Sequence, residues 1–214
     1  MTKHFKTDSV IVRKFNMKDV EQVYSNILFQ NDSENTQEKI TEGTNLESVK
    51  HESIEQTKLI VKSAINEYYT DEPTWAVEDK VNKNLVGVIR VTNYSKKNKM
   101  CNITWTMSYK YWDNKFMEEA LKQIFKFMFT KKNIELIECS YYEQDSNTST
   151  VLDEIGMTKE ATLRDRRFNE STNKKENFVI YSISKDEFFS LMNLSATKKT
   201  SKIEETYREL KIKI

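Results

Sequence analysis

The chain of 214 residues has few of the residues that build turns, disulfides and metal sites: three glycines, one proline, two cysteines and two histidines. Cys101 and Cys139 form neither a disulfide framework nor a metal-ligand pattern, so we expect small buried thiols in a reducing compartment. Residues 1–9 lack the apolar core of a signal peptide, and no apolar run approaches the ~20 residues that span a bilayer. The sequence therefore predicts a cytoplasmic location and no membrane partner.

The charges nearly cancel, with 34 lysines and arginines against 33 aspartates and glutamates. A net charge of +1 gives no overall field that favours nucleic acid or an anionic membrane as a partner. Hydrophobic residues make up 37% of the chain, but 11 Phe, 10 Tyr and 3 Trp supply bulky core material. We therefore expect one folded domain, with or without appended helices.

The first half of the chain predicts helices followed by an antiparallel meander. Helical spacing extends over Met17–Gln30, and a long or broken helix is expected over Leu46–Tyr69, with Gln30–Asn45 as a polar, mobile loop between them. The candidate buried positions of the second helix are Val49, Ile54, Leu59, Ile60 and Ile65. Strands are then expected at Thr74–Val77, Leu85–Val91 and Asn102–Met107, separated by polar turns.

The second half predicts a long amphipathic helix that opens at Asn114, then strands and short helices. A strand is expected over Ile134–Tyr142 and a helix over Asp145–Ile155, which Gly156 ends in the left-handed conformation. The apolar face of the long helix carries Met117, Ala120, Leu121, Ile124, Phe127 and Met128. The remaining expectations are strands near Thr158–Phe168 and Phe178–Ser184, a charged loop Asn169–Asn177, and terminal helices Lys185–Leu194 and Lys202–Leu210.

This order of elements predicts an α+β or mixed α/β fold with a mostly antiparallel sheet. We divide the chain into a domain over residues 1–187 and a C-terminal helical extension over residues 188–214. A short helix rarely holds itself together alone, so the tail from Ser195 onward is a candidate dimer element. The sequence thus leaves a homodimer as one hypothesis.

The most informative segment is Tyr111–Ala120, which follows a strand-like run and opens the long helix. This layout commonly places a phosphate-bearing ligand at a helix N-terminus. Loops that hold phosphate with backbone N–H groups usually carry glycine, because a missing Cβ permits close approach. This segment has no glycine.

Six stretches together carry a resemblance to a known family: Thr7–Arg13 with Asp19, Leu85–Ile89, Ile103–Met107 with Tyr111 and Trp112, Glu119–Leu121, Val151–Met157 and Val179–Ile183. From about Thr7 to Glu187 their order and spacing resemble the GNAT superfamily of acetyl-coenzyme A (acetyl-CoA) dependent N-acetyltransferases. The likeness is greatest to the RimJ/RimL type, which acts on ribosomal proteins. The resemblance implies a splayed central sheet that holds the pantetheine arm of acetyl-CoA.

The resemblance also implies the site residues and the reaction. Acetyl-CoA would be the co-substrate, and its acetyl group would pass directly to a primary amine, a protein N-terminus or a small amine, in a ternary complex. Glu119 and Thr148 are the candidate catalytic residues. The implied acetyl-CoA contacts are Thr106, Met107 and Ser108 at the strand end, Trp112, Asp113, Asn114, Lys115, Phe116 and Met117 in the pyrophosphate loop, and Asp145 and Thr148 after the next strand.

Several of these positions depart from the family pattern. Asp113 and Lys115 stand where the family usually has glycine, and Met117 stands where it usually has alanine. A carboxylate ~5 Å from the pyrophosphate would cost about 1–3 kcal/mol per unit charge, which Lys115 would offset. Asp145 replaces a usual Asn, and Thr148 a usual Ser. An alternative function follows: a catalytically silent GNAT-fold binding protein with a decayed acetyl-CoA site.

The catalytic base is not apparent. His4 and His51 are far from the proposed site in sequence, and Asn102 and Thr104 lie on the strand where a related enzyme carries a glutamate. An α-amine of pKa ~8 is about one-tenth neutral at pH 7, whereas a lysine amine is almost fully charged, so a weak-base enzyme favours α-amines. The basic group Arg164, Arg166, Arg167, Lys174 and Lys175 is interpreted first as a solvated strand edge and loop, with recognition of an acidic or ribosomal partner as the alternative.

Overall fold

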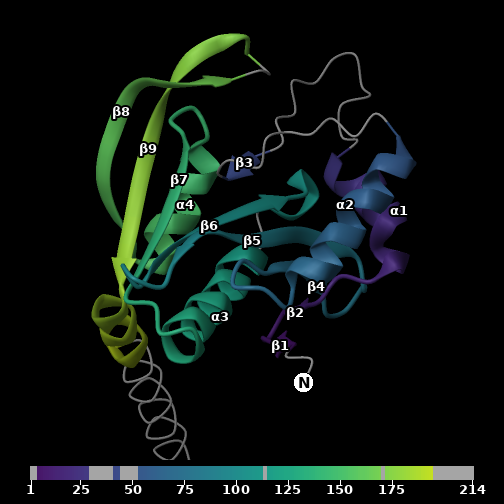
Figure 1. The fold of residues 1–214 in the computed structure, drawn as a ribbon, viewed down its shortest axis with the longest axis horizontal. Helices are drawn as coiled ribbons and strands as arrows, with labels where there is room; N and C mark the ends of the chain where they lie inside the picture. The colour runs from purple at the N-terminus through teal and green to yellow at the C-terminus, as the bar shows by residue number, and fades with distance from the viewer. Residues whose placement is uncertain (1–3, 29–40, 44–52, 113–114, 170–171, 195–214) are drawn as a thin grey trace, which may run out of the picture.

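All the strands described by the structure belong to one mixed sheet (Figure 1). The structure is a computed structural model and describes residues 4–28, 41–43, 53–112, 115–169 and 172–194. The strand order is β1-β2-β4-β5-β6-β7-β9-β8, and β3 pairs with β6 beside this path. The strands are β1 (Phe5–Lys6), β2 (Val10–Arg13), β3 (Thr41–Gly43), β4 (Thr74–Asp79), β5 (Leu85–Ser95), β6 (Met100–Met107), β7 (Leu136–Tyr142), β8 (Thr158–Asn169) and β9 (Lys174–Ser184).

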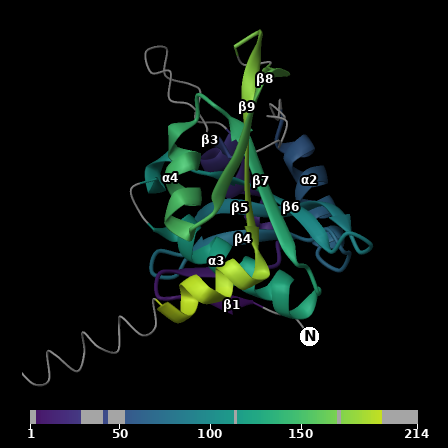
Figure 2. The ribbon, with the colours of Figure 1, turned by 90° about the vertical axis from the view of Figure 1, so that its left-hand side faces the viewer.

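The helices cover both faces of this sheet. Seen from the side of β8 and β9, α4 and α2 lie on opposite sides of it (Figure 2). The helical elements are η1 (Met17–Asp19), α1 (Val20–Gln22), the π-helical η2 (Val23–Leu28), α2 (Ile54–Glu67), η3 (Tyr109–Tyr111), α3 (Phe116–Lys131), α4 (Ser146–Ile155) and a helix over residues 185–194. The mixed α+β fold predicted from the sequence is therefore confirmed.

The alternation of side chains along β4 shows how the two faces are filled. Successive side chains of a strand point to opposite faces, and Trp75 and Val77 enter the larger core under α3 and α4. Ala76, between them, enters a smaller core under α1 and α2. The strand is buried on both sides, as expected for the centre of a sheet covered by two helical layers.

Helix α3 forms the centre of the larger core. The sequence identified most of its buried face, but Phe125 and Phe129 are also fully buried and Phe127 only partly so. Both buried rings contact Phe188 of the helix over residues 185–194, at centroid distances of 6.1 and 5.5 Å. This terminal helix, which the sequence predicted, packs on the domain; the division at residue 187 and the dimer stay predictions.

Helix α2 covers Ile54–Glu67 of the long or broken helix expected over Leu46–Tyr69; Ser53 caps it by accepting a hydrogen bond from the N–H of Gln56, and residues 46–52 lie outside the described part. Three other expectations from the sequence are wrong. Leu59 is 69% exposed and Ile60 38% exposed, because α2 turns Thr57, Val61 and Ala64 to the sheet instead. Part of the expected front loop is strand β3, and β8 and β9 extend through most of the expected loop Asn169–Asn177.

The other elements lie close to the positions that the periodicity and turn residues of the sequence predicted. The antiparallel β4-β5-β6 meander is present, and Gly156 ends α4 with a φ of 89°.

Cys101 and Cys139 are free, buried thiols, and burial raises the pKa of Cys101 to about 12, with the charge of Glu72 adding to the effect. No helix among the described residues is long and apolar enough to cross a membrane. The cytoplasmic location stays a prediction.

The sheet opens between β6 and β7, the two strands joined by α3. They pair in parallel only at Met100 with Leu136, Cys101 with Ile137 and Asn102 with Glu138. Beyond this point β6 continues to Met107 and β7 to Tyr142 without pairing to each other. The strands therefore diverge into a notch whose open end lies at their C-terminal ends.

Gly87 on β5 permits the close approach of β6 and α3 beside this notch. A Cβ at Gly87 would lie 2.5 Å from the carbonyl oxygen of Thr106 and 2.8 Å from Cε of Met117. We predict that Gly87→Ala lowers the free energy of unfolding by about 1–3 kcal/mol in urea titrations, as overpacking of a core does.

The double variant Gly87→Ala/Met117→Leu separates the two contacts. The Thr106 carbonyl belongs to the backbone and cannot move aside, so shortening Met117 should not restore stability. Full recovery in the double variant, or a Gly87→Ala protein as stable as the original, would contradict this packing account.

Candidate functional site

The notch between β6 and β7 is already occupied by a short segment of the same chain. Strand β3 pairs antiparallel with the end of β6, Thr41 opposite Met107, Glu42 opposite Thr106 and Gly43 opposite Trp105. It also lies close to β7 and α4 (Figure 1). Because β5 pairs with the other edge of the same β6 residues, both hydrogen-bonding edges of the β6 end are in use.

The three strand-end residues predicted as ligand contacts come together at this place. Thr106, Met107 and Ser108 are all buried, and Met107 points into the larger core. The N–H of Ser108 donates to the carbonyl of Val86 at 2.9 Å, so this donor is already used within the sheet. The backbone edge of Thr106 and Met107 toward the notch is therefore the part of this group best placed to meet a ligand.

At the N-terminus of α3, the N-cap residue Lys115 makes no side-chain capping bond, so the N–H groups of the first turn receive no hydrogen bond from that side chain. Just before it, the indole Nε1 of Trp112 is buried and has no acceptor among the described residues. A buried donor without a partner is costly, and a ligand oxygen would satisfy it. Asp113 and Asn114 lie outside the described part.

Charges in the first turns of α3 largely compensate each other. Glu118 is close to Lys122, with which it forms a hydrogen bond and ion pair, and its other oxygen lies 4.0 Å from Nζ of Lys115. Burial opposes ionisation of Glu118, but its hydrogen bonds with Lys122 and Glu154 and the charges of Lys122 and Lys115 outweigh burial and hold its pKa below the ordinary value. Glu118 is therefore a carboxylate at neutral pH, and its two lysines limit its repulsion of a bound phosphate.

Met117 and Glu119 have evident structural partners. Met117 is buried against Gly87, so only its backbone is available to a ligand. The carboxylate of Glu119 accepts hydrogen bonds from the N–H and Oγ of Ser9 at 3.1 and 3.0 Å. These bonds fasten α3 to the start of β2, a long-range contact that no sequence signal predicted. The catalytic role of Glu119 stays a prediction.

Asp145 and Thr148 form the N-terminal cap of α4. Asp145 accepts from the N–H of Thr148 at 3.1 Å and from its Oγ1 at 2.6 Å. Thr148 is 1% exposed, so its hydroxyl proton is directed at the Asp145 carboxylate. The predicted pair therefore stabilises the helix that borders the notch, and its role toward acetyl-CoA stays a prediction.

The structure distinguishes the two tyrosines at the end of β7, which the sequence did not. Tyr141 is buried beside Tyr181, with ring centroids 5.9 Å apart, whereas Tyr142 is half-buried and its hydroxyl donates to the carbonyl of Phe168. Burial, together with the nearby Tyr181, raises the pKa of Tyr141 well above its ordinary value. Tyr141 is therefore a protonated hydroxyl at neutral pH, at the β7 side of the notch.

A second polar group lies on the sheet face opposite α3. Arg90 on β5 is directly opposite Thr104 on β6, and Nε of Arg90 and Oγ1 of Thr104 are both buried without a partner among the described residues. Glu67 of α2 accepts from Arg90 at 3.3 Å and from Thr74 at 2.7 Å. Sequence reasoning missed Glu67 and Arg90, because their contact joins α2 to β5 and leaves no local pattern.

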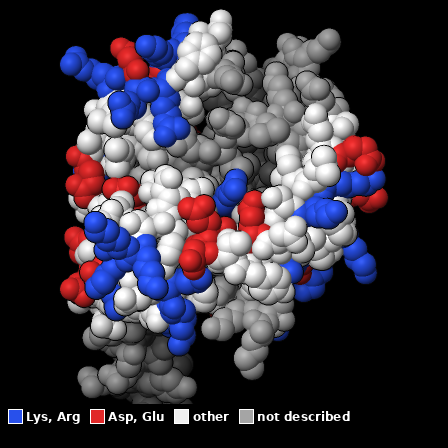
Figure 3. All heavy atoms as spheres, viewed as in Figure 1, with Lys and Arg blue, Asp and Glu red and all other residues white. Residues whose placement is uncertain are grey.

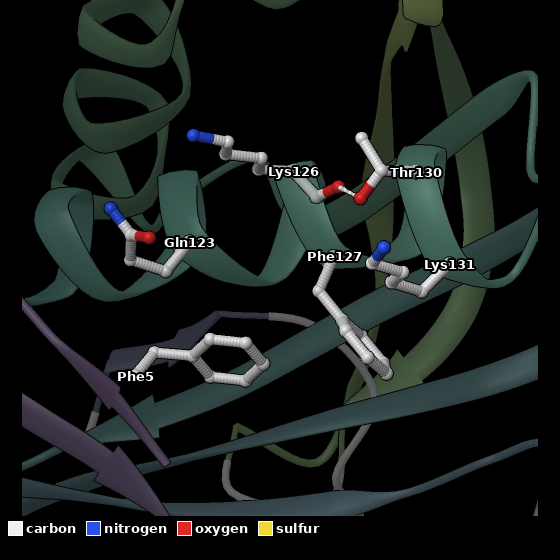
Figure 4. Close-up of a pocket in the computed structure, with 6 residues that line it drawn as sticks. All are labelled: Phe5, Gln123, Lys126, Phe127, Thr130 and Lys131. Carbon is white, nitrogen blue, oxygen red and sulfur yellow. Dashed lines mark hydrogen bonds between the residues drawn. The ribbon is translucent and has the colours of Figure 1, made fainter. Parts of the chain in front are cut away.

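The histidines and a hollow beside α3 are the remaining candidate sites. His4 is exposed, His51 lies outside the described residues, and no metal-binding cluster occurs among the residues that are described. A hollow of about 240 Å³ lies beside α3 and β1, with the rings of Phe5 and Phe127 as its floor (Figure 4). Figure 4 shows Oγ1 of Thr130 donating to the carbonyl of Lys126, and the titratable residues that line the hollow are the two lysines Lys126 and Lys131.

Sequence comparison identifies the family to which this splayed α+β fold belongs. The model of the acetyltransferase (GNAT) domain matches residues 9–158, which is most of the chain. The chain belongs to the GNAT family of N-acetyltransferases, so the predicted family, fold and enzyme class are confirmed.

Similar proteins and solved structures share the fold with this chain at low sequence identity. An uncharacterized N-acetyltransferase of Bacillus subtilis, YoaA, is 24% identical over 180 residues, covering 84% of this chain and 95% of that protein. The ribosomal-protein-S5-alanine acetyltransferase of Vibrio fischeri has a TM-score of 0.70 at 15% identity and covers 87% of this chain and 98% of its own. A spermidine N-acetyltransferase chimera from Vibrio cholerae and hSSAT has a TM-score of 0.65 at 14% identity, covering 84% and 98%. At these identities the structures establish the shared fold.

The cap of α4 can be tested apart from any activity. We predict that Asp145→Ala lowers the free energy of unfolding by about 1 kcal/mol, because the N–H and hydroxyl of Thr148 lose their acceptor. Asp145→Asn is the matched control and should cost only a few tenths of a kcal/mol, since its amide oxygen still accepts from the N–H. Urea denaturation measures both; equal stability of Asp145→Ala and the original protein would show that the cap contributes nothing.

Proposed function

We propose that the protein is an acetyl-CoA dependent N-acetyltransferase of the RimJ/RimL type. It moves the acetyl group from the thioester directly to a primary amine while both substrates are bound. The observation that carries this proposal is the notch between β6 and β7, whose β6 edge already pairs with the extended segment β3 and so accommodates an extended chain. A narrow, extended arm such as pantetheine suits a strand edge, which binds extended chains by main-chain hydrogen bonds.

The residues around the notch suit the rest of the co-substrate. The indole N–H of Trp112, which has no acceptor among the described residues, and the first-turn N–H groups of α3, which the Lys115 side chain does not cap, would provide donors for the pyrophosphate. Lys115 and Lys122 supply positive charge beside that turn, against the negative charges of Asp113 and Glu118. The backbone of Thr106 and Met107 would face the arm. Bound there, acetyl-CoA supplies an activated acetyl group with a thiolate leaving group.

The side chains present favour a weakly basic amine as the acceptor. No histidine is placed at the notch among the described residues, and Glu119 is engaged by Ser9. An α-amine of pKa ~8 is already about one-tenth neutral at pH 7, so it makes the smallest demand on a base. We infer that protein N-termini or small α-amines are the acceptors.

Strand β3 competes with the pantetheine arm for the same edge of β6. Three β3 residues pair with Trp105, Thr106 and Met107, which are the residues the arm would face. A pairing worth about two hydrogen bonds, at ~0.5–1.5 kcal/mol each, would weaken acetyl-CoA binding by roughly 5- to 150-fold. Binding then requires β3 to leave the notch, and this requirement lowers the apparent affinity without abolishing it.

The second candidate is a catalytically silent GNAT-fold protein. Two observations favour it: Asp113 and Lys115 replace the usual glycines, and β3 fills the edge that the arm would use. The two candidates differ in one measurable property, because only the enzyme releases free thiol from acetyl-CoA when an amine is added.

The proposed function is tested by thiol release with acetyl-CoA and a panel of α-amines, N-terminal peptides and polyamines. We predict amine-dependent release in the original protein and an increase of roughly tenfold in the KM for acetyl-CoA in Trp112→Phe, which loses about 1–1.5 kcal/mol of one hydrogen bond. Tyr111→Phe, beside it, is the matched control and should leave this KM unchanged. Absence of release with every acceptor would favour the silent protein.

The competition of β3 is tested with proline, which removes a backbone N–H. In an antiparallel ladder alternate residues turn their N–H to the partner, so either Glu42→Pro or the double variant Thr41→Pro/Gly43→Pro removes donors to β6. We predict that one of these variants binds acetyl-CoA at least fivefold more tightly in isothermal titration, and that the other changes less. Weaker binding in both would mean that β3 helps to hold the co-substrate.

A further inference from the structure

Strand β8 contains a bulge that turns two arginines out of the sheet. Leu163 pairs with Phe178 and Arg167 with Glu176, so Arg164, Asp165 and Arg166 lie opposite Asn177 alone. Asp165 has a φ of 47°, a left-handed conformation that is uncommon for a residue other than glycine. Bulges of this kind redirect side chains and occur next to active sites. Both arginines are exposed.

The bulge is fastened to the end of β7 by a chain of hydrogen bonds. The N–H of Asp165 donates to Oδ1 of Asn177 at 3.1 Å, and Nδ2 of Asn177 donates to Oε2 of Glu143 at 2.7 Å. The N–H of Glu143 in turn donates to the carbonyl of Asn177 at 3.0 Å. Glu143 directly follows β7 and precedes the Asp145 cap, so these bonds tie the bulge, across β9, to the C-terminal end of β7, which borders the open end of the notch.

Positive charge dominates this end of the hairpin. Figure 3 shows the cluster of basic side chains over β8 and β9 at the upper left. Nearby carboxylates are largely used: Glu176 is 6% exposed and accepts from Asn169 and Thr172, and Glu143 accepts from Asn177. Among the described residues, neither Arg164 nor Arg166 forms an ion pair with a carboxylate. The exposed basic residues are Arg164, Arg166, Arg167, Lys174 and Lys175, with Asp165 the exposed acid among them.

We propose that Arg164 and Arg166 select acceptors whose amine is followed by carboxylates, namely acidic N-terminal segments of a peptide or protein. This inference rests on the proposed acetyl transfer. A guanidinium binds a carboxylate through two parallel N–H bonds, so two arginines on a bulge tied to the end of β7 suit consecutive acidic side chains. The same charges repel polyamines. Nucleic acid is disfavoured because the chain has a net charge of only +1 and the rest of this face mixes both signs (Figure 3).

The experiment compares two peptides that share an N-terminal serine, one followed by four aspartates or glutamates and one by four glutamines. In the thiol-release assay the original protein should show at least a tenfold higher kcat/KM for the acidic peptide, mainly through KM. The preference should fall severalfold between 50 and 500 mM NaCl, because exposed charges are screened by salt.

The variant Arg164→Gln/Arg166→Gln should lose this preference and leave the glutamine peptide and the affinity for acetyl-CoA unchanged. Lys96→Gln/Lys97→Gln is the matched control: it removes the same charge from the exposed β5–β6 turn, at the closed end of the notch, and should keep the preference. Arg164→Lys/Arg166→Lys should retain part of it, since it keeps the charge and loses the paired N–H geometry.

Direct binding of the fluorescently labelled acidic peptide, measured by anisotropy without acetyl-CoA, separates this inference from the proposed function. Tighter binding of the acidic peptide that depends on the two arginines supports the surface even if no thiol is released. Equal binding of both peptides overturns it. The proposal is also overturned if single-stranded RNA binds to the arginines and the acidic peptide does not. A third contradicting result is a double variant that aggregates but still prefers the acidic peptide, because the arginines would then serve only to protect an edge strand from aggregation.

Discussion

The early separation of β6 from β7 is the constraint on which the rest of the site depends. Three residue pairs join the two strands. Beyond Asn102 and Glu138, the edge of β6 and the edge of β7 that face each other form no strand pairing. Buried backbone N–H and C=O groups are costly unless they are hydrogen-bonded, so this edge must be satisfied by something else. In the structure β3 does so, and acetyl-CoA is proposed to do so in turn. Helices α3 and α4 begin at this opening, where Trp112 and Thr148 meet it.

Electrostatics at the opening divide into a part proposed to hold the co-substrate and a part proposed to meet the acceptor. At α3, Lys115 and Lys122 lie beside Glu118, and Glu119 is the second acid of the first turn, so two lysines and two carboxylates balance before Asp113 is counted. Arg164 and Arg166 lie in the bulge of β8, the strand at the edge of the sheet beyond β7 and β9. A protein with almost no net charge therefore concentrates positive charge at one edge of its site.

The sequence predicted the elements whose signals are local. The amphipathic α3, the Gly156 terminus of α4 and the β4-β5-β6 meander depend on periodicity and turn residues, and the structure contains them. Thr41–Gly43 has no such signal, because three residues become a strand only through their pairing with β6. The candidate contacts at Thr106, Met107 and Ser108 came from the family resemblance. The bond of Glu119 to Ser9 spans 110 residues and was beyond any local pattern.

The central claim, that one backbone edge is shared by β3 and acetyl-CoA, is tested most directly by hydrogen exchange. Amide exchange is measured by mass spectrometry in peptides covering Thr41–Gly43 and Trp105–Ser108, with and without saturating acetyl-CoA. The account predicts faster exchange in the first peptide and undiminished protection in the second, because the ligand replaces β3 on β6. Unchanged exchange in both, with acetyl-CoA bound, would contradict it.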